Sequence, residues 1–226
     1  GCASGVAALH GVIPKRGDRL LPAVSALLAV IAFPPFHLLI PSFVALVPLA
    51  VWVADQKTGR EASDSEVSGG VFRGGVWFGV LYFGLLLYWI PSALASFTWW
   101  AVPAYLTVVL VLALGAGCFT WALHRLTYHG GIPLWLALPL TWTALEWLRA
   151  HAPGGMAFPW LGLGTSLTGY PELVGAAELV GARGITLWLA LLNGLIAEAV
   201  RTARARDGAR MSARWAAAFA LVLAVP

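Results

Sequence analysis

Long apolar stretches dominate the chain, and the few charged residues lie between them. No Asp, Glu, Lys or Arg occurs between Arg19 and Asp55, or between Arg73 and Arg125. A helix needs about 20 apolar residues to cross a hydrocarbon core about 30 Å thick, so each uncharged stretch predicts two membrane-spanning helices rather than one. The pattern predicts an all-α, polytopic membrane helix bundle of about seven spans, which we place at 20–34, 36–54, 75–95, 101–123, 132–149, 184–200 and 213–226.

Prolines and polar runs mark the connections between these spans. The run "FPPF" at 33–36 cannot continue a helix and predicts a tight helical hairpin between the first two spans. The polar composition of Asp55 to Gly70 predicts a solvated loop, which we extend to 55–74. A second connection, 150–183, is rich in Gly and Pro and predicts an irregular loop at the membrane interface.

The overall composition supports a membrane protein. Hydrophobic residues make up 60% of the chain and charged residues 11%, with a mean hydropathy of +0.81, whereas soluble domains carry about 25% charged residues. The formal net charge of +4 comes from basic residues scattered between apolar runs. No basic patch has the density that binding to a nucleic acid requires, so that class of partner is not predicted.

The basic residues also predict an orientation. If the chain crosses the membrane at each predicted span, 12 of the 14 Lys and Arg residues fall on one side, and only Arg149 and Arg183 fall on the other. Short cytoplasmic loops retain Lys and Arg. We therefore expect a cytoplasmic N-terminal tail at 1–19 and a transmembrane domain at 20–226, with loop 55–74 in the cytoplasm and loop 150–183 on the outer, periplasmic face.

Cysteine and histidine usage gives no metal or redox site. The two cysteines, Cys2 and Cys118, form no CxxC pair and have no metal-ligand spacing, so neither a disulfide framework nor a zinc site is supported. No cofactor is predicted. Cys118 lies within a predicted span, where an inert thiol packed in the core is the expected arrangement.

The most specific motifs follow the fifth predicted span. An E-[FW]-L-R element occupies Glu146 to Arg149, a G-x-x-F-P-W element occupies Gly155 to Trp160, and a Gly-rich turn covers Gly162 to Ser166. A proline-led segment and a span carrying Asn193 come next. In this order the motifs resemble those of the apolipoprotein N-acyltransferase family, and the resemblance covers nearly the whole chain.

The resemblance implies an enzyme of the bacterial inner membrane. Its partners would be a phospholipid acyl donor, a diacylated apolipoprotein acceptor and membrane lipid, since the family transfers an acyl chain from a phospholipid to the N-terminal diacylglyceryl-cysteine of lipoproteins. It also implies a nitrilase-like catalytic domain after residue 226, with a Glu, Lys and Cys triad. Neither Cys2 nor Cys118 has the neighbours of a triad cysteine, so no catalytic residue is assigned and this stretch alone is expected to be inactive.

Two groups of residues are candidates for a role in this activity. Glu146 and Arg149, at spacing i, i+3, are expected to form a structural ion pair that fixes the helix end, or to anchor the outer loop or a lipid headgroup. Phe158, Pro159 and Trp160 either pack at the membrane interface or form one wall of a cleft through which acyl chains enter.

Two other functions stay open at the level of the sequence. One is a transporter-like bundle, although transporters usually carry charges within their spans or paired broken helices, and the long apolar stretches here, 20–54 and 74–124, are free of charge. The other is a membrane anchor for a fused enzyme of another class, such as a glycosyltransferase.

Overall fold

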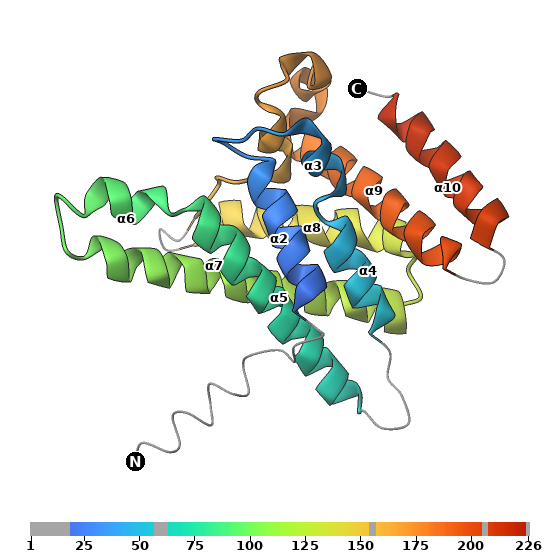
Figure 1. Ribbon diagram of the computed structural model, residues 1–226, viewed down its shortest axis with the longest axis horizontal. Coiled ribbons are helices and arrows are strands. Elements are labelled where there is room, and N and C mark those ends of the chain that lie inside the picture. Colours follow the sequence, from blue (N-terminus) through green and yellow to red (C-terminus); the bar gives the residue numbers. More distant parts are fainter. Residues whose placement is uncertain (1–18, 57–62, 154–156, 205–207, 225–226) are drawn as a thin grey trace.

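The computed structural model describes residues 19–56, 63–153, 157–204 and 208–224, and every regular element within those ranges is helical (Figure 1). The prediction of an all-α protein is therefore confirmed for the described residues. The predicted tail, apart from Arg19, lies outside them, as do Cys2 and parts of both predicted loops at 57–62 and 154–156. The helices are α2 (Leu20–Ile31), α3 (Leu39–Val44), α4 (Val47–Asp55), α5 (Asp64–Leu86), α6 (Trp89–Leu94), α7 (Ala101–His124), α8 (Leu134–Ala150), α9 (Ala177–Ala203) and α10 (Gly208–Leu223).

Several of these helices suit a bilayer. Among the described residues, three helical stretches are long and apolar enough to cross a membrane: Asp64–Leu94, Ala101–His129 and Ala177–Ala203. Two shorter apolar stretches, Leu20–Ile31 and Leu39–Asp55, accompany them. The membrane character of the chain is thus supported, while the count of about seven spans stays a prediction.

The predicted loop at 55–74 is shorter than expected, because α5 begins at Asp64. Ser63 caps the helix: its hydroxyl accepts a hydrogen bond from the Glu66 backbone N–H, and the Glu66 carboxylate accepts one from the Ser63 N–H at 2.9 Å. This reciprocal capping box satisfies two of the free donors of the first turn. The polar composition that indicated a loop belongs in part to the solvated first turns of a long helix.

The centre of the bundle is a close crossing of α5 and α7. A Cβ at Gly79 would lie 2.6 Å from the Cα of Ala113, so only glycine permits this approach, as small residues do in helix pairs within membranes. Phe78 and Tyr82 stack beside the crossing with ring centroids 5.5 Å apart, and Trp142 of α8 packs edge-on against Phe78. The core therefore joins α5, α7 and α8.

The helix ends gather in two groups. One group, the loop end, holds the α2–α3 link, the end of α5 and the connection between α8 and α9, where the Tyr170 hydroxyl donates to the His37 carbonyl at 2.6 Å (Figure 1). The other group, the arginine end, is held together by polar contacts. The Leu134 N–H donates to the Glu198 carboxylate, and Arg201 and Arg204 form ion pairs with Glu198 and Asp55. Arg149 and Arg183 lie at the loop end, where Arg183 bonds to Glu146. The membrane orientation, and the side of the membrane on which each end lies, stay predictions.

Candidate functional site

Glu146 holds the connection between α8 and α9 in place. Its side chain is fully buried and accepts four hydrogen bonds from three parts of the chain. Oε1 accepts from Trp142 Nε1 at 2.8 Å and from the Leu163 backbone N–H at 2.6 Å, and Oε2 accepts from Arg183 Nη1 at 2.8 Å and Thr186 Oγ1 at 2.9 Å. A buried carboxylate is tolerated when its charge is paired and its lone pairs are satisfied. This Glu146 cluster fastens the loop to both helices.

The predicted ion pair between Glu146 and Arg149 is not the pair that forms. Glu146 pairs with Arg183, whereas Arg149 donates from Nη2 to the Leu161 carbonyl at 3.0 Å and lies 5.6 Å from the centre of the Phe83 ring. The i, i+3 spacing does place Glu146 and Arg149 one turn apart. The loop folds back over the helix end, however, so Arg149 bonds to Leu161 of the loop, while Glu146 pairs with Arg183 of α9.

The Gly-rich turn lies directly against α9. A Cβ at Gly164 would lie 2.7 Å from the Ala182 carbonyl oxygen and 3.0 Å from the Thr186 nitrogen, so the turn needs glycine at this position. The Gly164 N–H donates to the Thr186 hydroxyl at 3.0 Å. The turn continues as a 3-10 helix, η3 (Leu163–Leu167), whose Leu167 is fully buried.

Asn193 extends the polar contacts to the first hairpin. It is fully buried in α9; its Oδ1 accepts from the Leu46 N–H at 2.9 Å and its Nδ2 donates to the Ser42 carbonyl at 3.1 Å. These bonds satisfy backbone groups at the break between α3 and α4, where no helix partner is available. The break divides the predicted span 36–54, and α9 stabilises it.

We call the connection between α8 and α9 the fastened loop, because Glu146 holds it in place. Its surface carries Phe158, Pro159 and Trp160. The Phe158 N–H donates to the Arg149 carbonyl at 2.8 Å, and the Phe158 ring packs edge-on against Trp160 with centroids 5.1 Å apart. Phe158 is half-buried and Pro159 is exposed, while 64% of Trp160 is exposed. The loop therefore presents a large aromatic side chain away from the core.

An apolar hollow lies beside the segment Phe158 to Trp160 of the fastened loop. Its lining comes from the α2–α3 link, the end of α5, the start of α6 and the residue after Trp160: Phe33, Pro34, Pro35, Leu86, Tyr88, Trp89 and Leu161. The volume is about 330 Å³. Hydrocarbon is the ligand chemistry that such a lining fits. Within the described ranges, no group of three or more His, Cys, Asp or Glu side chains could hold a metal ion.

The comparisons with known proteins identify the family. Residues 25–195 match the family model described as apolipoprotein N-acyltransferase N-terminal domain. The chain belongs to this family. It is 32% identical to the apolipoprotein N-acyltransferase of Rhizobium leguminosarum bv. trifolii over 90% of this chain and 37% of that protein, and 28% identical to that of Geobacter metallireducens over 87% and 36%. The chain thus spans about 37% of the length of a curated apolipoprotein N-acyltransferase that it matches.

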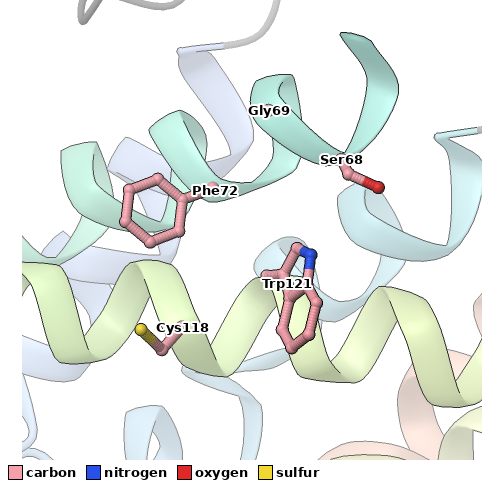
Figure 2. Close-up of a pocket in the computed structure, with 5 residues that line it drawn as sticks. All are labelled: Ser68, Gly69, Phe72, Cys118 and Trp121. Atoms are coloured by element: carbon pink, nitrogen blue, oxygen red, sulfur yellow. The ribbon is translucent and has the colours of Figure 1, made fainter. Parts of the chain in front are cut away.

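The sequence alone did not reveal the partners of Glu146. Arg183 and Thr186 lie 37 and 40 residues further along the chain. An available signal was Arg183 itself, a charged residue at the start of an apolar span, because such residues usually have a polar partner within the protein. The expectation for Cys118 was also wrong, since its thiol is exposed on α7 rather than packed in the core (Figure 2).

Proposed function

We propose that this chain is the membrane domain of an apolipoprotein N-acyltransferase. The full enzyme would transfer an acyl chain from a phospholipid to the α-amine of the N-terminal diacylglyceryl-cysteine of a lipoprotein. In that transfer an ester bond of the phospholipid breaks, an amide bond forms, the amine loses a proton and a lysophospholipid leaves. Family membership supports this proposal and gives no support to a transporter or to an anchor for a glycosyltransferase.

The observation that carries the proposal is the contact between the fastened loop and the apolar hollow. Leu161 lines the hollow and follows Trp160 directly, and the Arg149 guanidinium holds its carbonyl. We infer that an acyl chain of the phospholipid donor enters the hollow, with Phe158, Pro159 and Trp160 as one wall of its path. The domain would orient lipid, while the covalent chemistry would be performed by the remaining part of the enzyme.

The proposed orientation places the loop end on the outer, periplasmic face of the bacterial inner membrane. The excess of Lys and Arg at the opposite end supports it, because cytoplasmic loops retain positive charge. Trp99 and Trp100, directly before α7, are 71% and 59% exposed, as suits side chains at the headgroup level.

The test is acyl transfer by the full-length protein in vesicles, from a labelled phospholipid to a diacylated lipopeptide. Trp160→Ala should leave expression and stability near those of the unsubstituted protein and slow the transfer about tenfold or more, since a misplaced reacting group costs rates of that order. Trp99→Ala is the matched control, because it removes a similarly exposed indole, 71% against 64% for Trp160, from the same end. Unchanged turnover in Trp160→Ala, or equal losses in both variants, would contradict the role of the wall.

A further inference from the structure

A second apolar hollow lies between α5 and α7, apart from the loop end. Ser68, Gly69 and Phe72 of α5 and Cys118 and Trp121 of α7 line it (Figure 2). This α5–α7 groove has a volume of about 380 Å³, and it opens outward, since Cys118 is exposed and Trp121 is 42% exposed. Both helices belong to stretches apolar enough to cross a membrane, so the groove faces lipid.

Two guanidinium groups flank the groove on the side of the arginine end. Arg125 lies over Trp121, with its Cζ 5.5 Å from the ring centre. Arg73 follows Gly69 by one helical turn toward the loop end. Its Nη1 nevertheless lies 3.9 Å from the point where a Cβ at residue 69 would be. Its side chain therefore runs back toward the arginine end, as long cationic side chains do when they reach from a span toward the interface.

The ion pairs of the described residues include neither Arg73 nor Arg125. The groove therefore combines two cations at its interfacial end with an apolar lining that continues toward the bilayer centre. From Arg125 to Cys118 is seven residues, which corresponds to about 10 Å along α7. A membrane lipid with a negatively charged headgroup has the same division of charge and hydrocarbon over such a length.

We propose that the α5–α7 groove binds an anionic phospholipid of the bilayer. The phosphate lies between the guanidinium groups of Arg73 and Arg125, and one acyl chain follows Phe72 and Cys118. Basic pockets between membrane helices recognise anionic headgroups through this combination of charge and apolar contact. The site is separate from the hollow at the loop end, and its existence does not depend on the proposed acyl transfer. The proposed orientation places this site in the cytoplasmic leaflet, and only that placement depends on the orientation.

The first test measures which lipid the full-length protein retains after purification in mild detergent. Native mass spectrometry would compare phosphatidylglycerol with phosphatidylcholine added in equal amounts. The unsubstituted protein should retain phosphatidylglycerol preferentially. Arg73→Gln and Arg125→Gln should each lower that preference about fivefold, the equivalent of about 1 kcal/mol for one arginine at an anionic lipid surface.

Two matched controls separate the groove from surface charge and from helix stability. Arg204→Gln removes an exposed arginine at the same end that pairs with Asp55 instead, and it should leave the preference unchanged. Gly69→Leu should fill the groove and abolish retention, since a Cβ there meets only the Arg73 side chain within 4 Å. Gly70→Leu adds the same side chain one residue away, where a Cβ meets nothing within 4 Å, and it should retain the lipid.

The Cys118 thiol supplies a test that needs no variant. In nanodiscs that contain phosphatidylglycerol, its reaction with a lipid-soluble maleimide, followed by peptide mass spectrometry, should be several-fold slower than in phosphatidylcholine alone. Equal reaction rates in the two bilayers would overturn the proposal. A preference for phosphatidylglycerol that Gly69→Leu leaves intact, or that Arg204→Gln lowers as much as Arg125→Gln, would also overturn it.

Discussion

Replacement of Glu146 tests how the loop between α8 and α9 is held. Glu146→Ala removes the acceptor of four hydrogen bonds, two of which come from the Trp142 indole and the Leu163 backbone. Each buried donor left without a partner costs about 1–3 kcal/mol. One third of the Arg183 side chain is exposed, so it can turn toward water and lose less. We expect a total loss of about 3–5 kcal/mol in the free energy of unfolding, as for other broken buried pairs.

Glu146→Gln is the conservative comparison. Its carbonyl oxygen can still accept from Trp142 and Leu163, but its amide nitrogen would face the Arg183 guanidinium, so the expected loss is about 1–3 kcal/mol. The assay is unfolding of the full-length protein in mild detergent by titration with a denaturing detergent. Equal stability of Glu146→Ala and the unsubstituted protein would contradict the role of this carboxylate in the fold.

A double-mutant cycle then identifies the partner. Glu146→Gln combined with Arg183→Gln should show a coupling energy of about 1–3 kcal/mol, while the combination with Arg149→Gln should couple by less than about 0.5 kcal/mol. The reason is that Glu146 Oε2 lies 2.8 Å from Arg183, whereas Arg149 donates to a backbone carbonyl. A larger coupling to Arg149 than to Arg183 would refute the assignment and restore the pair that helix spacing alone predicted.

Three further predictions concern the loop, the first hairpin and the topology. Gly164→Ala should destabilise the full-length protein by about 1–3 kcal/mol, because its Cβ would clash with α9; Gly175→Ala, where a Cβ meets nothing within 4 Å, should change the unfolding free energy by less than about 0.5 kcal/mol. Asn193→Leu should cost about 1–3 kcal/mol in the same unfolding assay, since the buried Leu46 N–H loses its acceptor, and a stability equal to that of the unsubstituted protein would argue against this bridge. In cells whose outer membrane has been permeabilised, Gly175→Cys should react with an impermeant thiol reagent, and Ser65→Cys should react only after the inner membrane is lysed. The reverse order would reject the proposed orientation.

The helical, membrane-embedded character of the chain could be predicted from its sequence because long uncharged stretches permit few other structures in lipid. The membrane orientation, which rests on the order of the apolar stretches and the positions of the basic residues, stays a prediction. The start of α5 was misjudged, although Ser63 and Glu66 have the spacing of a capping box. That signal was available and was outweighed by the polar composition.

The candidate site was only partly predictable. Glu146 was recognised as a residue with a structural partner, but the partner was assigned from helix spacing, which contains no information on how a loop folds back. The bonds from Arg183 and Thr186 to Glu146 span 37 and 40 residues and depend on the position of α9. The bonds from Asn193 to the first hairpin span about 150 residues. Such contacts are set by tertiary packing rather than by local pattern.

The central claim is that the fastened loop places Trp160 against the acyl chain of the lipid substrate. The most direct measurement replaces Trp160 in the full-length protein with a photoreactive aromatic residue and identifies the products of its cross-linking in membranes by mass spectrometry. We expect cross-links to the hydrocarbon of the donor phospholipid, lower yields when Glu146→Ala releases the loop, and much weaker cross-linking to the donor from the same replacement at Trp99. Equal labelling from both positions, or labelling that does not depend on Glu146, would contradict the account.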